Sequence, residues 1–144
     1  MNRIIAFDIG DKRIGVAISD PFGEMALPLE TYHRKAFKQD VEYLANLAKS
    51  KEAVKIVCGL PVNFDGSPSV QTEKTLAFIE KLKGQTDIEV VTTDERFTTL
   101  EARRLLLEAD MRRDKRKQVI DKIAASYILE DYLGKIKRAE GKNG

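Results

Sequence analysis

Hydrophobic residues form three short runs in the first third of the chain, and turn-forming residues separate them. The runs are residues 3–9, 14–19 and 26–32, and the links between them are residues 10–13 and 20–23. Short apolar runs bounded by Gly, Pro and Asp are typical of β-strands joined by tight turns. They predict an antiparallel meander whose first strand is buried on both faces. Its third strand contains Pro28 and is expected at a sheet edge.

The hydrophobic spacing changes to a helical period after this meander. Val41, Leu44, Ala45 and Ala48 share one face of a helix predicted over residues 38–50. The later elements are, in order, a strand over 54–59, a loop over 59–69, a helix over about 68–83, a strand over 88–93, a helix beginning near 98 and a helix over roughly 119–138. The order βββαβαβαα predicts an α/β protein with one mixed five-stranded sheet flanked by helices.

Short motifs mark the ends of the predicted helices. Ser67-Pro68 is typical of an N-cap followed by proline in the first turn, and Gly84 is typical of a helix end. Thr98-x-x-Glu101 has the form of a capping box for the next helix. We expect a single domain over residues 1–138 and a flexible tail over 139–144, where Gly and Lys are frequent.

The composition is that of an ordinary globular protein. The chain has 144 residues, of which 42% are hydrophobic and 33% charged. Its apolar stretches are too short to cross a bilayer, and residue 3 leads directly into a strand pattern rather than a signal peptide, so we expect a cytoplasmic protein. Cys58 and His33 are the single residues of their kinds, which excludes an internal disulfide and a Cys/His zinc site. Neither belongs to a recognisable nucleophile–base pair.

Basic residues are concentrated in the last third of the chain. Residues 1–95 contain 12 Lys/Arg and 15 Asp/Glu, whereas residues 96–144 contain 13 Lys/Arg and 8 Asp/Glu. Five of the six residues from 112 to 117, predicted as the link between the last two helices, are basic. Such a run favours contact with the phosphates of a polyanion, although a solvated loop has the same composition.

Three acidic residues could form a site for divalent cations. Asp8 lies within an apolar strand, Glu95 follows the last strand, and Asp121 lies near the start of the final helix, before small residues that allow close packing on a sheet. Two Mg²⁺ ions held by carboxylates can activate water and shield phosphate charge during phosphodiester hydrolysis. Each acid also has a structural explanation. Asp8 could cap the next turn or pair with Lys12 or Arg13, Glu95 could lie in a solvated turn, and Asp121 could favour a helix N-terminus.

Four motifs occur in order along the chain, and they are FDIG at 7–10 continuing to RIGVA at 13–17, GLP at 59–61, DERFT at 94–98 and DKIAA at 121–125. Together they resemble the YqgF family, also called RuvX-like, whose members are named as Holliday junction resolvases or pre-16S rRNA nucleases. The resemblance covers about residues 3 to 133. It implies a ribonuclease-H-like fold with strand order 3-2-1-4-5, and a cytoplasmic nuclease that acts in maturation of the 5′ end of the ribosomal RNA.

The resemblance also implies the site residues. By position, Asp8, Glu95 and Asp121 are the expected catalytic and metal-binding residues, with Mg²⁺ or Mn²⁺ as the cofactor. The residues expected to bind nucleic acid are Lys12, Arg13, Arg96, Arg112, Arg113, Lys115, Arg116 and Lys117. The first and fifth strands lie two spacings apart in this order, roughly 9.5 Å. Because Glu95 must reach across that distance, we expect weak metal binding in the absence of nucleic acid.

Other functions compete with cleavage of pre-rRNA. Branched DNA is the second candidate substrate. The DIG motif at 8–10 with Gly15 also resembles the phosphate-binding hairpin of actin-like ATPases and sugar kinases, but those enzymes need two such lobes and this chain has room for one. A non-catalytic protein could instead bind structured RNA through the basic C-terminal third, with structural roles for the acids.

Overall fold

The computed structural model describes residues 2–63, 65–95, 100–110 and 113–143. The elements are β1 (Ile4–Ile9), β2 (Arg13–Ser19), β3 (Ala26–His33), α1 (Phe37–Ser50), β4 (Lys55–Leu60), α2 (Val70–Gln85), β5 (Glu89–Asp94), α3 (Leu100–Asp110) and α4 (Arg113–Asn143). This order is the predicted one, and each strand end lies within one residue of its predicted position.

The strands form one mixed sheet in the order β3-β2-β1-β4-β5, which confirms the predicted strand order and the α/β class. β1 pairs antiparallel with β2 and parallel with β4. Pro28 lies in the edge strand β3, opposite Ala17 and beside a register irregularity between Val16 and Ala17. An edge strand tolerates proline because one of its sides needs no ladder hydrogen bonds.

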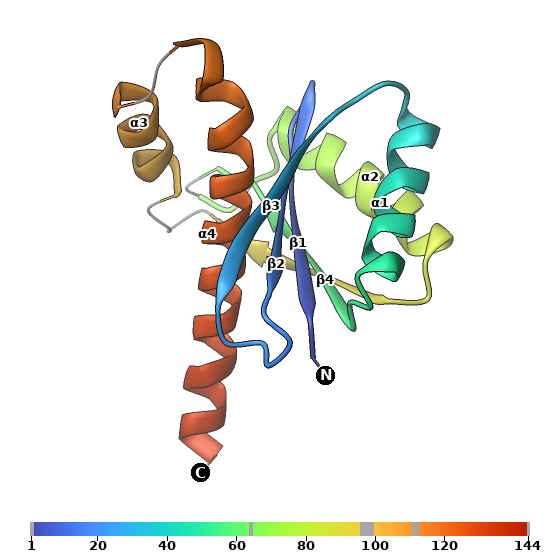
Figure 1. Cartoon of the computed structure of the whole chain (residues 1–144), viewed down its shortest axis with the longest axis vertical. Coiled ribbons are helices and arrows are strands. Elements are labelled where there is room, and N and C mark those ends of the chain that lie inside the picture. Colours follow the sequence, from blue (N-terminus) through green and yellow to red (C-terminus); the bar gives the residue numbers. More distant parts are fainter. Residues whose placement is uncertain (1, 64, 96–99, 111–112, 144) are drawn as a thin grey trace.

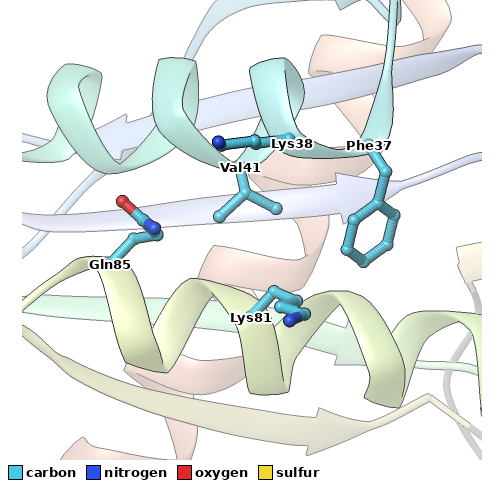
Figure 2. Close-up of a pocket in the computed structure, with 5 residues that line it drawn as sticks. All are labelled: Phe37, Lys38, Val41, Lys81 and Gln85. Carbon is cyan, nitrogen blue, oxygen red and sulfur yellow. The ribbon is translucent and has the colours of Figure 1, made fainter.

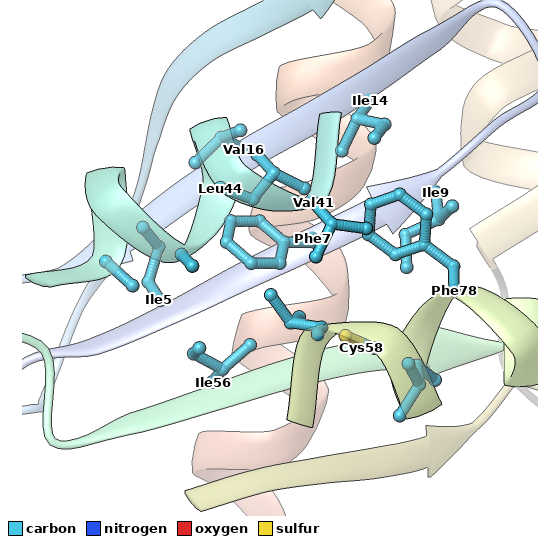
Figure 3. Close-up of a cluster of buried hydrophobic side chains, with 14 of the residues drawn as sticks. Ile5, Phe7, Ile9, Ile14, Val16, Val41, Leu44, Ile56, Cys58 and Phe78 are labelled. Carbon is cyan, nitrogen blue, oxygen red and sulfur yellow. The ribbon is translucent and has the colours of Figure 1, made fainter. Parts of the chain in front are cut away.

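Helices cover both faces of the sheet (Figure 1). α1 and α2 lie on one face, where Phe7 of β1 packs with Leu44 and Phe78 in a buried cluster (Figure 3). α4 lies on the other face, where Ala6 of β1 packs in a second buried cluster with Leu129. Because side chains alternate between the two faces of a strand, this double coverage explains why β1 is apolar at nearly every position.

α2 begins and ends two residues later than predicted. Ser69, rather than Ser67, is the N-cap, because its hydroxyl accepts a hydrogen bond from the N–H of Thr72 while the Thr72 hydroxyl accepts one from the N–H of Ser69. This reciprocal capping box satisfies two N–H groups that Ser67 would leave open. Gly84 lies inside the helix rather than at its end, since a helical glycine costs only about 1 kcal/mol relative to alanine.

α4 is longer at both ends than the predicted helix over 119–138. The loop predicted for the basic run was wrong from Arg113 onward, because the backbone there is already helical, and Arg and Lys are good helix formers. Residues 139–143 are also helical, where a flexible tail was expected. The division into one domain and a tail stays a prediction. None of the described helices combines the length and apolar character needed to cross a membrane.

α3 packs against α4 (Figure 1). Arg103 of α3 lies 3.7 Å from Glu130 of α4 and stacks over the ring of Tyr127. Leu105, on the same helix, is largely exposed. The predicted capping box cannot be compared, because Thr98 lies outside the described residues.

Candidate active site

Asp8 is the last residue but one of β1 and faces α4. It follows Ile4 and Ala6 at every second position along the strand, and both of those residues pack in the cluster beneath α4. The side chain of Asp8 is 21% exposed, so it lies at the edge of the core that Ile4 and Ala6 help to form. This burial raises the pKa of Asp8, while the neighbouring guanidinium of Arg104 opposes the shift.

Gly15 of β2 lies opposite Asp8 and brings α4 against the sheet. A Cβ on Gly15 would lie only 1.9 Å from the backbone carbonyl oxygen of Asp121, so a larger residue would displace the helix. Asp121 itself is 6% exposed, and the close packing expected beside it is confirmed. Because α4 begins at Arg113, Asp121 lies in the helix interior, and its interpretation as a helix-start acid was wrong.

A guanidinium bridges Asp8 and Asp121. Arg104 of α3 donates from Nη1 to Oδ2 of Asp8 at 2.5 Å and from Nη2 to Oδ1 of Asp121 at 3.2 Å. Burial alone would lower the pKa of Arg104, but the two carboxylates raise it. The planar fork of arginine suits such a bridge because its donors are held in a fixed geometry.

A second arginine holds the other oxygen of Asp121. Arg13, the first residue of β2, donates from Nε to Oδ2 of Asp121 at 2.6 Å. The ion pair considered for Asp8 therefore exists with a different partner, since Asp8 pairs with Arg104 while Arg13 pairs with Asp121. Lys12 is exposed in the turn between β1 and β2. Two carboxylates and two arginines thus form one charge-balanced cluster.

Glu95 shares a cavity with Asp8. The cavity has a volume of about 240 Å³, and its lining includes Asp8, Gly59, Glu95 and Arg104. Gly59 lies on β4, between the strands that lead to the two acids, and a Cβ there would lie 3.5 Å from Cγ of Glu95. The missing side chain at Gly59 leaves room for Ile128 of α4, whose Cδ1 would lie 2.6 Å from that Cβ, whereas the distance to Glu95 is an ordinary van der Waals contact. Both carboxylate oxygens of Glu95 are buried, so the interpretation of a solvated turn was wrong.

The three acids do not fit a metal ion in this arrangement. Among the residues that the structure describes, no group of three or more His, Cys, Asp or Glu side chains could hold a metal ion. The guanidinium of Arg104 lies between Asp8 and Asp121, and Glu95 follows a strand two positions away from β1. Carboxylate oxygens are suitable ligands for a hard divalent cation, but the three acids are not arranged around a common point where an ion could bind.

Other hollows lie on the surface of the described residues. One, of about 590 Å³, adjoins the acids through Arg13, and its lining residues are Asp11, Lys12, Arg13, His33, Arg34, Lys35, Ala36, Phe37 and Asp40. The other, of about 330 Å³, lies between α1 and α2 (Figure 2), and its lining residues are Phe37, Lys38, Val41, Lys81 and Gln85. The second hollow lies on the sheet face opposite Asp8 and has no acid among its lining residues, so it is a poorer candidate site.

Asp40 of α1 organises the turn that follows β1. It is 1% exposed, and its carboxylate accepts hydrogen bonds from the Tyr32 hydroxyl, from Nε of Arg34 and from the N–H of Lys35, each at 2.9 Å. Arg34 also donates to the carbonyl oxygen of Gly10 at 2.9 Å. Burial alone would raise the pKa of Asp40, but the hydrogen-bond donors lower it. The network therefore ties α1 to the residue that directly follows β1.

We expect Asp40→Asn to lower the free energy of unfolding by about 2 kcal/mol at neutral pH, because hydrogen bonds from charged and neutral donors lose their anionic acceptor. The pKa of Asp40 is lowered in the folded state, so its contribution is complete above the pKa of an unfolded Asp, about 3.9, and is lost as the pH falls through the folded-state value. Urea unfolding at several pH values measures this. A difference between wild type and variant that persists unchanged in acid would contradict the role of the ionised carboxylate.

Sequence reasoning missed Asp40 and Arg104. A signal for Asp40 was present, because it lies four residues before Leu44 on the buried face of the helix, where an acid is unusual. Arg104 gave no such signal. It lies in a helix beside Arg103, and its partner Asp8 is 96 residues away in the chain.

The remaining predicted residues are placed only in part. Arg96 and Arg112 lie outside the described residues. The backbone of α4 includes Arg113, Lys115, Arg116 and Lys117, but their side chains also lie outside what the structure describes. The nucleic-acid-binding role of these residues stays a prediction.

Cys58 and His33 lie on different strands, outside the acid cluster. Cys58 is fully buried in β4, and burial raises the pKa of its thiol to about 12. His33 is exposed at the end of β3. A thiol with such a high pKa is a poor nucleophile.

Comparison with known proteins identifies similar sequences over nearly the whole chain. Residues 2–135 match the family model RuvX, described as Holliday junction resolvase. A protein of Clostridium acetobutylicum named "Putative pre-16S rRNA nuclease" is 46% identical over 134 residues, which cover 93% of this chain and 99% of that protein. A protein of the same name from Desulforamulus reducens is 46% identical over 131 residues, which cover 91% and 96%.

Solved structures with little sequence similarity share the fold. The fowlpox virus resolvase in complex with Holliday junction DNA matches with a TM-score of 0.57 at 12% identity, covering 93% of this chain and 98% of that one. RuvC of T. thermophilus in complex with a Holliday junction matches with a TM-score of 0.56 at 9% identity, covering 92% and 94%. These matches confirm the ribonuclease-H-like fold expected from the sequence.

Proposed function

We infer that this chain, which belongs to the RuvX family, is a hydrolase. It would cleave phosphodiester bonds in nucleic acid. The observation that carries the proposal is the gathering of acids at the carboxyl end of β1. Asp8 and Asp121 converge on one guanidinium, and Glu95 shares a cavity with Asp8. Open α/β sheets bind their ligands at this end of the strands. Buried acids are costly to maintain, so their gathering supports a functional role.

The favoured substrate is pre-16S rRNA, with cleavage at its 5′ end during ribosome biogenesis in the cytoplasm. The names of relatives that are 46% identical support this choice. Branched DNA is the second candidate, because the resolvases that share the fold at 9% and 12% identity are described with Holliday junctions. Much closer sequence similarity favours the RNA. Phosphate contacts alone do not distinguish the two, since they carry no base information.

The hollow beside the acids supports binding of a nucleic-acid backbone. Lys12, Arg13, Arg34 and Lys35 line it, and Lys12 and Lys35 are exposed. Cations placed next to a cleavage site neutralise phosphates on either side of the cut bond and release bound counterions. Arg13 belongs both to this hollow and to the acid cluster, so the two regions are continuous.

The proposed cofactor is Mg²⁺ or Mn²⁺, because carboxylate oxygens are the ligands that these ions prefer. The acids do not fit such an ion while Arg104 bridges Asp8 and Asp121. The arrangement therefore has to change before an ion binds.

Single-turnover cleavage of labelled substrates tests the proposal. Purified protein is incubated with a pre-rRNA fragment that spans the 5′ end of 16S rRNA and, separately, with a four-way DNA junction, each with Mg²⁺ or Mn²⁺. We expect cleavage of the RNA that depends on the cation. Cleavage of the junction alone would identify branched DNA as the substrate in place of pre-rRNA. Binding without cleavage of either substrate would overturn the proposal and favour a non-catalytic RNA-binding protein.

We expect the combined replacement of Arg112, Arg113, Arg116 and Lys117 by alanine to weaken nucleic-acid binding. Each lost phosphate contact should reduce the slope of log affinity against log salt by about 0.7–0.9. Filter binding at several salt concentrations measures this. A matched control replaces Lys137 and Arg138, which are exposed near the other end of the same helix. If affinity and slope stay at the wild-type values in both variants, the basic run is merely solvated.

A further inference from the structure

We propose that Arg104 acts as an internal cation that excludes a divalent metal ion from Asp8 and Asp121 until its guanidinium withdraws. The proposal rests on the proposed function only for the identity of the metal. Its physical content is a competition between a guanidinium and a dication for the same carboxylate oxygens. Arg104 is therefore a positioning residue that holds the free protein in a metal-excluding state.

The geometry carries the competition. Arg104 donates to one oxygen of Asp8 at 2.5 Å and to one oxygen of Asp121 at 3.2 Å, so a single planar group fills the space between the two acids. Arg13 takes the remaining oxygen Oδ2 of Asp121 at 2.6 Å. A metal ion that bound both acids would need an oxygen of Asp121, and Arg104 holds one of these oxygens while Arg13 holds the other. The two arrangements are therefore mutually exclusive.

Charge balance acts in the same direction. The two guanidiniums offset the charges of the two carboxylates with which they pair, and this weakens the attraction of Asp8 and Asp121 for a dication. Placing a dication there without moving Arg104 would bring like charges together in a half-buried site, where repulsion is weakly screened. Removing Arg104 leaves two acids against one arginine, and the site then favours a cation.

Arg104 can withdraw without opening the core. A third of its side chain is already exposed (33%), and its helix α3 lies at the edge of the molecule against α4 (Figure 1). A freed guanidinium matches two phosphate oxygens as well as it matches carboxylates. The phosphates of a bound nucleic acid would therefore offer Arg104 a partner other than the two acids.

Metal binding to the free protein tests this proposal without any cleavage assay. Isothermal titration with Mn²⁺ compares wild type with Arg104→Gln, which keeps a long polar side chain but removes the charge. If the bridged state holds nine-tenths or more of the molecules, Arg104→Gln binds Mn²⁺ at least about tenfold more tightly than wild type. Equal or weaker binding by the variant would overturn the proposal.

The neighbouring arginine provides a matched control. Arg103 is on the same helix but contacts Glu130 and Tyr127 rather than the acids. Arg103→Gln should bind Mn²⁺ as weakly as wild type. The double variant Asp8→Asn/Arg104→Gln should lose the gain, because one of the two ligands is missing. A gain that survives in the double variant would place the metal elsewhere and reject the model.

Thermal unfolding covers the case in which Arg104→Gln is unstable. Without metal, its two acids repel each other, so its Tm falls below that of wild type. Mn²⁺ should then raise the Tm of Arg104→Gln more than that of wild type or Arg103→Gln, because an ion that binds only the folded state stabilises it. An equal rise in all three would contradict the proposal. Since cleavage is not measured, failure here is distinct from failure of the nuclease assignment.

Discussion

We expect Asp8→Asn to abolish cleavage while the protein still folds and binds nucleic acid. Asparagine keeps the size of the side chain and one acceptor oxygen, but it removes the negative charge that a cation or a polarised water requires. We expect the single-turnover rate to fall at least about a hundredfold, as for loss of one charge-stabilising group in other enzymes. Binding should stay equal or become tighter, because one charge that repels phosphate is gone.

The control for this experiment is another aspartate of the same domain. Asp131 lies ten residues beyond Asp121 on α4, outside the acid cluster, and Asp131→Asn should cleave at the wild-type rate. Equal cleavage by wild type and Asp8→Asn would indicate a contaminating nuclease and reject the assignment. Circular dichroism and thermal unfolding of both variants establish that any loss is not a loss of fold.

Gly15→Ala is expected to have the largest effect on stability. The added Cβ would lie 1.9 Å from the carbonyl oxygen and 2.4 Å from the carbonyl carbon of Asp121, which are backbone atoms and cannot rotate away. Either β2 or α4 must shift. We expect the free energy of unfolding to fall by about 4 kcal/mol or more, beyond ordinary overpacking, with cleavage lost as well because Asp121 moves from Asp8.

Gly84→Ala is the matched control for this change. Gly84 lies inside α2, and an added Cβ would meet nothing within 4 Å. Alanine there should stabilise the protein by about 0.5–1 kcal/mol, because it restricts the unfolded chain and favours a helix. Urea unfolding measures both variants. If Gly15→Ala unfolds at the same urea concentration as wild type, α4 does not depend on this close approach.

The strands could be predicted because the information is local. Apolar runs and turn residues act over a few positions, and they sufficed to place β1 through β5. The order of the strands in the sheet was implied by the family resemblance, and the structure confirms it. Helix ends were harder where two signals compete. Ser67-Pro68 and the Ser69–Thr72 box lie within six residues, and only the hydrogen bonds of the folded chain decide between them. A charged segment gives little hydrophobic periodicity, which is why the start of α4 was placed too late.

The acids could be proposed from their positions, but their partners could not. Asp8 is anomalous in an apolar strand, and that anomaly is visible without a structure. Its pairing with Arg104 joins residues that are 96 positions apart, and no local pattern reports such a contact. The expectation of weak metal binding was based on the distance between β1 and β5. The structure supplies a second physical reason for it, in a guanidinium that already occupies Asp8 and Asp121.

The contact between Gly15 and the backbone of Asp121 joins segments of the chain that are synthesised at different times. Arg13 and Asp121 are 108 residues apart, so the hairpin that carries Asp8 leaves the ribosome long before the helix that completes the acid cluster. Domains acquire such long-range contacts late in folding. A nascent or truncated chain that lacks α4 therefore holds Asp8 without Asp121. The Arg13–Asp121 ion pair and the close packing at Gly15 therefore cannot form until synthesis of the chain is nearly finished.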